Sequence, residues 1–287
     1  MQIRQSDLAS FARCAQQKKL ADQQRDGLLS QPPEQLSMTA YGSVIHHAMH
    51  VLEKAHAQKI PDPLGQAIAT FEYYWDQRHI EAICPPVTIW AARDTHQGYM
   101  RKGVAILRLY YEQLKKDTGK LLALEYSFTL PYLLDGVEHT IHGTIDRLSV
   151  RKGSQAFLNI EDYKSGQDYI SLRHNLQFTM YALATTYPAF WGQFEDGDQL
   201  YHRFRLIPRR GTWISLRAGV RRSDAGYRGP QDFARLEAAM REYVKAHERD
   251  VFPLNLKGDT CRFCPFQNGL CGGVPVPAED YGRAGVA

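Results

Sequence analysis

The hydrophobic pattern of the chain changes its period near residue 121, and this change limits the possible folds more than any other feature. Before it, apolar residues recur at helical spacing in regions that begin at about residues 41, 64 and 96. After it, apolar and polar residues alternate through 122–134 and 137–150, which flank Asp135-Gly136 and predict a β-hairpin with a tight turn. Helices followed by a sheet with further helices indicate an α/β or α+β fold.

Other segments extend this pattern along the chain. The stretch at 158–166 predicts a third strand, which follows a turn at 151–155. Further elements are expected as helices over 6–20, 175–187 and 231–249 and as strands over 199–207 and 212–217. A chain of 287 residues can bury the core of one large domain. We therefore expect one domain over 1–287 with three consecutive parts, which are a mainly helical part (1–120), a sheet core (121–220), and a helix with a Pro/Gly/Cys-rich tail (221–287).

The sequence lacks the signals of a membrane or secreted protein. No stretch approaches the ~18 consecutive apolar residues of a membrane helix. The first residues, MQIRQSDLAS, do not have the basic and apolar regions of a signal peptide. We expect a cytoplasmic protein with no membrane partner. In that compartment, the five cysteines of the chain are more often metal ligands or free thiols than disulfides.

Arginine is concentrated between Tyr201 and Pro230. This segment holds eight arginines, no lysine and a single acid, Asp224, in a chain whose net charge is only +4. A local positive excess of this kind suits a polyanion such as nucleic acid, and it is equally typical of a solvated arginine-rich surface. The part from Arg203 to Arg222 is therefore a candidate nucleic-acid-binding surface.

The stretch LNIEDYKSG, which begins at Leu158, places charged residues inside a strand that otherwise has a buried pattern. Successive side chains of a strand point to opposite faces, so Asp162 and Lys164 share the inward face with Leu158 and Ile160. Burying a carboxylate and an ammonium group is costly unless they pair with each other or meet a metal. A structural ion pair at the strand end and a functional metal site both explain this pattern.

A second acid lies at a corresponding place on the preceding strand. Fifteen residues and one tight turn separate Asp146, in the stretch HGTIDRL, from Asp162, so the two strands are expected to be neighbours. Two converging carboxylates suit a hard cation such as Mg²⁺ or Mn²⁺. Phosphodiester hydrolysis needs such a metal to polarise the phosphate and acidify a water, and a group such as Lys164 to orient the water or offset charge.

Two predicted helices contribute further candidates. His46 and His50 lie on the polar side of the helix that begins near residue 41, and no HExxH glutamate lies between them. On the sequence pattern alone, a solvated or core-edge position explains each of these histidines better than a metal does. Gln177 and Tyr181 lie one turn apart on one helix face, which an ordinary polar face would also explain.

The cysteines form a second group of candidates. Cys261, Cys264 and Cys271 form the spacing C-x2-C-x6-C, and Cys14 offers a fourth thiolate from the other end of the chain. Four thiolates suit zinc or an iron–sulfur cluster, and the spacing alone does not choose between them. Three unrelated thiols are the alternative, which the Pro/Gly-rich context of the tail disfavours. Cys84 has no partner motif and is expected to be structural.

Taken in order, these motifs resemble those of a known family. GSVIH, HGTIDRL, IEDYKSG and QFTMY, followed by the C-terminal cysteines, are similar to motifs of the RecB-like branch of the PD-(D/E)xK nuclease superfamily. More narrowly, they resemble the iron–sulfur exonucleases associated with CRISPR systems and phages, from Cys14 to Cys271. The resemblance implies an α/β fold with a restriction-endonuclease-like mixed β-sheet core flanked by helices, a helical N-terminal region and a C-terminal Cys-rich iron–sulfur segment.

The resemblance also implies roles for individual residues. The divalent cation, Mg²⁺ or Mn²⁺, would be held by His46, Asp146, Asp162 and the backbone carbonyl of Tyr163. The catalytic residues would be Asp146, Asp162, Lys164, Gln177 and Tyr181, of which the last two position the lysine and the nucleic acid strand. A [4Fe-4S] cluster would be held by Cys14, Cys261, Cys264 and Cys271, and would tie the two ends of the chain together.

Together, the residues and the resemblance predict a metal-dependent deoxyribonuclease. The reaction would be attack of a metal-activated water on a phosphodiester, assisted by Lys164 and leaving a 5′-phosphate. The resemblance implies exonucleolytic degradation of single-stranded DNA and an association with recombination or CRISPR adaptation proteins. The alternative is a catalytically weak DNA-binding or assembly subunit of such a complex. The complete set of site residues argues against this alternative, because a degenerate site would usually have lost one of them.

Overall fold

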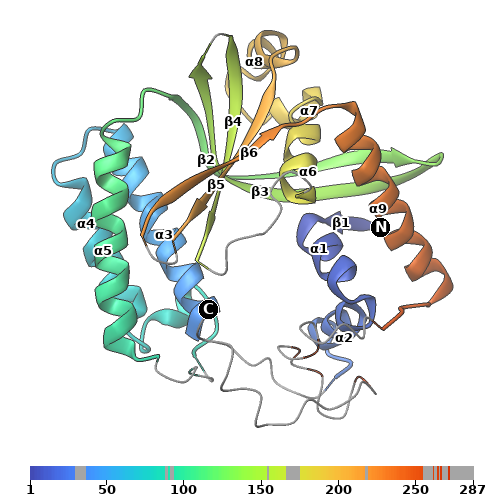
Figure 1. The fold of residues 1–287 in the computed structure, drawn as a ribbon, viewed down its shortest axis with the longest axis horizontal. Coiled ribbons are helices and arrows are strands. Elements are labelled where there is room, and N and C mark those ends of the chain that lie inside the picture. Colours follow the sequence, from blue (N-terminus) through green and yellow to red (C-terminus); the bar gives the residue numbers. More distant parts are fainter. Residues whose placement is uncertain are drawn as a thin grey trace. The chain divides into compact units, whose positions relative to one another are not determined.

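The computed structural model divides into two compact units. Figure 1 shows the helices and strands along the chain. The described residues are 1–29, 37–87, 90, 94–153, 155–165, 175–216 and 219–254, together with positions 261, 264, 266 and 271. The first unit comprises Met1–Glu34, Pro131–His142 and Ala234–Ala287, and the second comprises Gln35–Leu130 and Gly143–Phe233. Most of the predicted loop before residue 37 and most of the Cys-rich tail lie outside the described residues. In the described part of the chain, no helix is long and apolar enough to cross a membrane.

A mixed sheet forms the centre of the second unit. Strand β3 (Val137–Lys152) pairs antiparallel with β4 (Ala156–Lys164), β4 pairs parallel with β5 (Arg209–Ser215), and β5 pairs antiparallel with β6 (Arg221–Tyr227). Strand β2 (Lys120–Leu134) also pairs with β3. The predicted hairpin is confirmed, and both residues of its turn have positive φ, 50° at Asp135 and 82° at Gly136. The mixed sheet between helices confirms the predicted α/β class.

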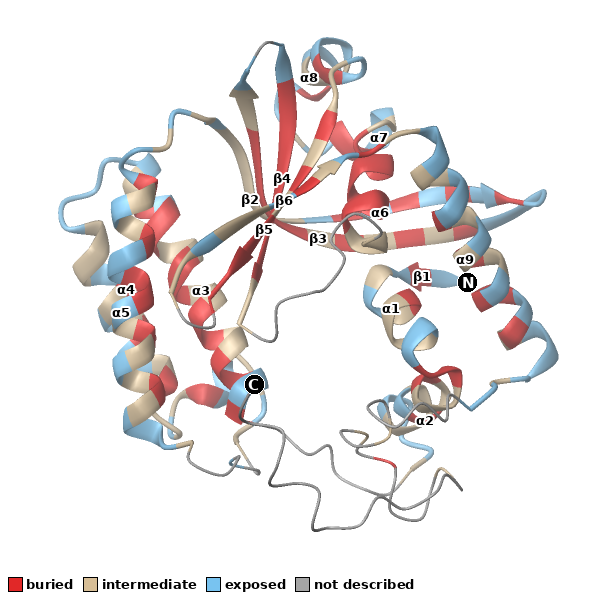
Figure 2. Cartoon of the chain, viewed as in Figure 1, coloured by how far each residue is buried: buried red, intermediate tan, exposed pale blue. Residues whose placement is uncertain are grey.

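Three helices form the largest core of this unit. Helices α3 (Ser37–Ala57), α4 (Pro63–Trp75) and α5 (His96–Leu114) bury their apolar faces against one another (Figure 2). A short 3₁₀ helix, η1 (Ile80–Ala82), follows α4. Tyr163 of β4 and Ile214 of β5 belong to the same core, so the helices cover one face of the sheet. The three helical regions predicted before residue 121 are therefore confirmed.

Helix α6 (Leu176–Ala184) covers the sheet from the other side. Tyr163 contacts Tyr110 of α5, whereas its neighbour Asp162 contacts Gln177 of α6. Because successive residues of a strand face opposite sides, these contacts place α5 and α6 on opposite faces. Gly211 allows the close approach of α6, since a Cβ atom there would lie 2.7 Å from the ring of Phe178.

The first unit contains the N-terminal helices. Strand β1 (Gln2–Arg4) pairs parallel with the first part of β3, and helices α1 (Gln5–Arg13), α2 (Ala15–Arg25) and α9 (Pro230–Arg249) complete its described elements. The single helix predicted over 6–20 is wrong, because Cys14 adopts an extended backbone (φ −162°, ψ 112°) and ends α1. The break allows Lys18 of α2 to lie 3.2 Å from Asp7 of α1.

Two predictions for the region after residue 175 need correction, and one strand there was not predicted. The helix predicted over 175–187 ends at Ala184, and Pro188 begins the separate helix α7 (Pro188–Trp191). The strand predicted over 199–207 is wrong, because this segment forms helix α8 (Gly197–Phe204) and the short turn after it. The alternating apolar residues of this segment do not share one buried face, since Phe204 is buried whereas Leu206 is 84% exposed. Strand β6 was not predicted, because its residues are mostly polar.

Candidate metal and phosphodiester site

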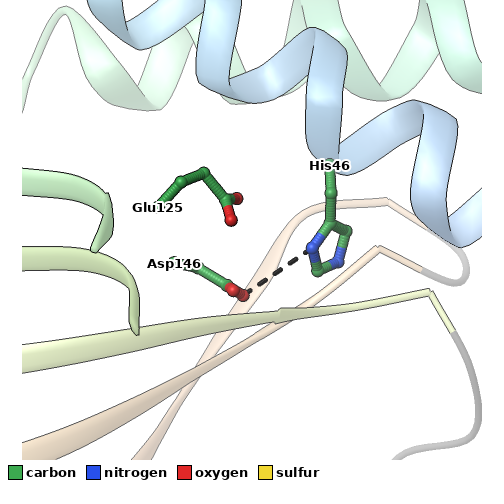
Figure 3. A group of neighbouring side chains, drawn as sticks. All are labelled: His46, Glu125 and Asp146. Carbon is green, nitrogen blue, oxygen red and sulfur yellow. Dashed lines mark ion pairs between the residues drawn. The ribbon is translucent and has the colours of Figure 1, made fainter. Parts of the chain in front are cut away.

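Three side chains from three elements of the second unit converge on a common space (Figure 3). They are His46 of α3, Glu125 of β2 and Asp146 of β3, and their ligand atoms all lie within 4.8 Å of one another. The Nδ1 atom of His46 lies 3.8 Å from an Oδ2 atom of Asp146. Two of these residues, His46 and Asp146, were predicted from the sequence as metal ligands, and the third was not.

His46 is held in the form that can bind a metal. Burial, and secondly the charge of Lys164, lower the pKa of His46 to about 4, so its imidazole is neutral at pH 7. Its ring packs edge to face against Tyr163, with 5.8 Å between the centroids. One turn earlier, Gly42 brings α3 close to the end of β4, because a Cβ atom there would lie 2.7 Å from Ser165 Oγ. The stretch GSVIH thus positions the histidine through its glycine.

Asp162 and Lys164 share one face of β4, as their spacing predicts. Lys164 Nζ donates a hydrogen bond to Asp162 Oδ1 at 2.8 Å and lies 2.7 Å from Oδ2. Gln177 Nε2 donates to the same Oδ1 atom at 2.6 Å and to the hydroxyl of Tyr181 at 3.0 Å. The structure therefore joins four of the five predicted catalytic residues, with the carboxylate of Asp162 at their centre. Asp162 is only 1% exposed.

Asp146, the fifth of these residues, lies beside this group. Its Oδ2 atom accepts a hydrogen bond from the backbone N–H of Tyr163 at 2.6 Å. Burial raises the pKa of Asp146 and raises that of Asp162 to about 6, although the charge of Lys164 opposes both shifts. Buried acids with raised pKa values are frequent at functional sites, because a cation or a proton must balance their charge.

Glu125 was not among the predicted ligands, although its strand was expected to lead toward the site. Burial, and then the charges of Asp146 and Asp162, raise the pKa of Glu125 to about 8. Its backbone has a positive φ of 46°, which is unfavourable for a residue with a side chain. The sequence indicates that the strand carrying Glu125 leads toward Asp146. It does not predict the left-handed backbone at Glu125, which accompanies the close approach of the Glu125 carboxylate to His46 and Asp146.

Metal-free protein is expected to lose stability as the pH rises from about 6.5 to about 8. In this range, folded Glu125 keeps its proton up to a pKa of about 8, whereas the unfolded chain releases it near the ordinary value of 4.5. The folded state binds more protons, so rising pH favours unfolding. The lowered pKa of His46 acts in the opposite direction, but its effect is complete above the ordinary value of 6.5. Thermal unfolding in EDTA checks this, and a melting temperature that rises across the interval would contradict it.

A buried ionic network lies next to the site and was not predicted. Arg147 Nε donates to Glu53 of α3 at 2.5 Å, and Arg147 Nη1 donates to Glu161 at 2.7 Å. The hydroxyls of Tyr110 and Tyr163 also donate to Glu53. Glu53 lies seven residues after His46, which places both on one side of α3. The network therefore connects the helix that carries His46 to the strands that carry Asp146 and Asp162.

The four predicted cluster cysteines lie in the first unit. Cys14 is buried at the break between α1 and α2, and Cys264 donates its backbone N–H to the carbonyl of Cys261 at 3.0 Å. Burial raises the pKa of the Cys264 thiol, and the charges of Cys271, Cys14 and Cys261 raise it further. A raised pKa keeps the Cys264 thiol protonated at pH 7 unless a metal binds it as the thiolate.

The arginine-rich segment is less available to a ligand than its composition suggests. Four of its arginines have partners within the second unit, either backbone carbonyls or acids; these are Arg209, Arg210, Arg222 and Arg228. Three others are exposed, namely Arg203, Arg205 and Arg221, and Arg217 lies outside the described residues. Of the predicted basic surface from Arg203 to Arg222, these three side chains are the exposed arginines that the structure describes.

The donor set of the candidate site fits a hard divalent cation. Carboxylate oxygens with one neutral imidazole are ligands that Mg²⁺ and Mn²⁺ accept. Asp162 Oδ2, although close to Lys164 Nζ, has no hydrogen bond of good geometry in its buried position. This oxygen is held by its ion pair with Lys164, so it would keep that contact if it also took part in metal binding.

Comparison with known proteins agrees with this chemistry. The sequence model of the PD-(D/E)XK nuclease superfamily matches residues 3–271. Among solved structures, the chain is similar to the crystal structure of SSO0001, with 11% sequence identity, a TM-score of 0.34 and coverage of 86% of this chain and 91% of that chain. No curated protein matches the sequence. Because the family match spans nearly the whole chain, the protein belongs to the PD-(D/E)XK nuclease superfamily.

Proposed function

We propose that this protein is a metal-dependent DNA exonuclease that hydrolyses phosphodiester bonds of single-stranded DNA. Membership of a nuclease superfamily supports the reaction class. The observation that carries the proposal is the convergence of His46, Asp146, Asp162 and Lys164 in the second unit, with acids of raised pKa beside one ammonium group. The preference for single strands and for DNA ends rests on the resemblance of the sequence motifs.

The divalent cation would be held by His46, Asp146, Asp162 and the backbone carbonyl of Tyr163. When bound, Mg²⁺ or Mn²⁺ supplies Lewis acidity, which polarises the scissile phosphate and acidifies a water. The chain prepares this site through Tyr163, whose backbone N–H fixes Asp146 and whose ring packs against His46. The ligands are therefore oriented before the cation arrives.

We assign to Lys164 a direct contact with the reacting water or phosphate. Its ammonium group lies beside Asp162 and 5.7 Å from the ring centroid of Trp213, which limits the positions it can take. From there it would orient the attacking water or offset charge that develops on the phosphate. Gln177 is a positioning residue, because it acts through Asp162, and Tyr181 fixes Gln177 in turn. Tyr181 itself is 2% exposed, so its contact with DNA is not part of this proposal.

The exposed arginines Arg203, Arg205 and Arg221 are our candidates for contacts with the DNA backbone. Contacts with phosphates release counterions, so binding should weaken steeply as the salt concentration rises. A DNA affinity that does not change with salt would remove these arginines from the proposal. The association with recombination or CRISPR adaptation complexes remains a prediction from the sequence motifs.

The experiment that tests the exonuclease compares linear and circular single-stranded DNA of the same sequence. Full-length protein, purified without oxygen, is incubated with each DNA in Mg²⁺ or Mn²⁺, with EDTA as the control. We expect the linear DNA to be degraded and the circular DNA to persist, because an exonuclease needs an end. Equal loss of both DNAs would indicate an endonuclease. Tight binding without cleavage in either metal would instead support the DNA-binding or assembly subunit.

We also propose that Cys14, Cys261, Cys264 and Cys271 hold a [4Fe-4S] cluster. Their mutual electrostatic influence on Cys264 supports a shared ligand, and the sequence resemblance supports the choice of iron and sulfur over zinc. The extended backbone at Cys14 has a role in this proposal, because it ends α1 and sets Cys14 apart from the regular helix. The cluster would join the N-terminal and C-terminal segments of the first unit.

Cys264→Ser is expected to remove the brown colour of anaerobically purified protein and to lower its iron content. Ser replaces the thiolate with a weaker ligand of similar size, so the cluster should be lost or labile. Cys84→Ser is the matched control, because Cys84 lies in the second unit and packs against the core of α3, α4 and α5. Colourless wild-type protein that contains zinc and no iron would contradict the cluster, and would leave the nuclease proposal intact.

A further inference from the structure

Glu125 differs from the other acids of the site in what surrounds its carboxylate. Asp162 is held by Lys164 and Gln177, and Asp146 accepts the backbone N–H of Tyr163. Within the part of the chain that the structure describes, Glu125 makes no hydrogen bond or ion pair. A half-buried carboxylate without such a partner is costly in its charged form, so that form needs a compensating positive group.

The charges around Glu125 indicate the sign of that group. The acids Asp146, Asp162 and Glu53 repel its carboxylate, and Lys164 attracts it. The site face thus contains three carboxylates, Glu125, Asp146 and Asp162, against the single ammonium of Lys164, while Glu53 is engaged by Arg147. When all three carboxylates are ionised, two negative charges remain, which one divalent cation balances.

The backbone directs Glu125 toward the same place. Its left-handed conformation interrupts the regular strand β2, and unfavourable backbone of this kind often occurs at functional sites. Figure 3 shows the carboxylate of Glu125 pointing to the space between Asp146 and His46. The three ligand atoms lie within 4.8 Å of one another, a separation that small shifts of the side chains would close around one ion.

We propose that Glu125 is a direct ligand of the divalent cation, together with His46 and Asp146. This inference rests on the proposed function, since it concerns the same metal site, and it adds a ligand that the sequence motifs do not include. The donor set then contains one imidazole and three carboxylates. Asp162 binds the cation and also holds Lys164. Glu125 contributes a carboxylate that holds no other side chain among the described residues.

Metal binding by full-length, metal-free protein tests this ligand without any DNA. Mn²⁺ affinity is measured by titration calorimetry and by the EPR signal of free Mn²⁺, for the wild type and for Glu125→Gln. Gln keeps the size of the side chain and the same backbone demand, but it removes the charge. We expect the variant to bind Mn²⁺ about tenfold more weakly, or worse. Glu112→Gln is the control, because Glu112 pairs with Lys115 on the surface of α5, and it should bind Mn²⁺ as the wild type does.

Thermal unfolding gives a second readout, because the variant should be the more stable protein in EDTA and should gain less stability from Mn²⁺. In EDTA, Glu125→Gln should melt at a higher temperature than the wild type at pH 8, because it removes repulsion among the acids. Addition of Mn²⁺ should raise the melting temperature of the wild type by more than it raises that of the variant. A residue that only supports the fold would lower the melting temperature in both conditions. Mn²⁺ affinity of the variant within twofold of the wild type would overturn the proposal.

Asp146→Asn separates this proposal from the proposed function. If Asp146→Asn loses Mn²⁺ binding while Glu125→Gln retains it, then Glu125 is not a ligand and the nuclease site stands. If wild-type protein binds no Mn²⁺, or if Asp146→Asn binds it as well as the wild type does, both the proposed metal site and the role of Glu125 are overturned.

Discussion

Arg147→Met is expected to lower the free energy of unfolding by about 3–5 kcal/mol, the usual cost of removing one member of a buried ion pair. Arg147 has a side chain that is only 3% exposed. Its guanidinium lies 2.9 Å from Asp117 and hydrogen-bonds to Glu53 and Glu161. Met fills a similar volume but offers no charge or donor. The large cost therefore comes from the acids that remain buried.

The acids around Arg147 differ in the partners that they keep when Arg147 is replaced. Glu161 keeps Arg222 at 2.7 Å and Arg151 at 3.0 Å, whereas Glu53 keeps only the hydroxyls of Tyr110 and Tyr163 as described partners. Glu53 therefore carries most of the uncompensated charge. Adding Glu53→Gln to Arg147→Met should recover part of the lost stability, because the remaining amide is neutral.

Chemical denaturation of the full chain measures these effects. Arg78→Met is the matched control, because Arg78 pairs with Asp76 in solvent, and its unfolding transition should stay close to that of the wild type. Arg147→Met with wild-type stability would contradict the description of the network. A double variant less stable than Arg147→Met alone would show that Glu53 contributes by its shape or hydrogen bonds and not through its charge.

Lys164→Ala is expected to lower the rate of DNA cleavage by about 10²–10³-fold, the usual cost of removing one group that stabilises charge in a transition state. Folding should persist, because the Lys164 side chain is 33% exposed at the end of β4. Mn²⁺ affinity should be retained or increased, because the substitution removes a positive charge beside the metal ligands. The variant therefore separates chemistry from metal binding.

Single-turnover cleavage of end-labelled DNA measures this loss, with Mn²⁺ affinity determined on the same preparations. Lys115→Ala is the control, since Lys115 pairs with Glu112 at the surface and should leave the rate unchanged. Equal rates for Lys164→Ala and the wild type would mean that another group assists the water, or that a contaminant cleaves the DNA. A loss of Mn²⁺ binding with the loss of rate would assign Lys164 a structural role.

The sequence predicts the parts of this site that depend on local period. Alternation along β4 places Asp162 with Lys164, and the helical spacing of Gln177 and Tyr181 places both on one face of α6, as the structure has them. The hairpin is equally local, since Asp135 and Gly136 accept the positive φ values of a tight turn. Such features need no knowledge of the rest of the chain.

The parts that the sequence does not predict depend on distant partners. Glu53 has the pattern of an exposed helical residue until Arg147, Tyr110 and Tyr163 reach it from three other elements. Arg222 belongs to an arginine-rich segment that suggests nucleic acid, yet Glu161 binds it within the protein. Composition gives the charge of a segment, whereas its availability depends on the acids that folding brings near.

The central claim is that Asp146 and its neighbours form a metal-dependent nuclease site, and EDTA-sensitive cleavage tests it most directly. Wild-type protein and Asp146→Asn are compared on end-labelled single-stranded DNA in Mn²⁺, with and without EDTA, after both are shown to unfold cooperatively. We predict that the wild type degrades the DNA, that EDTA stops it, and that Asp146→Asn is inactive. Cleavage that persists in EDTA, or that is equal in the two proteins, would contradict the claim.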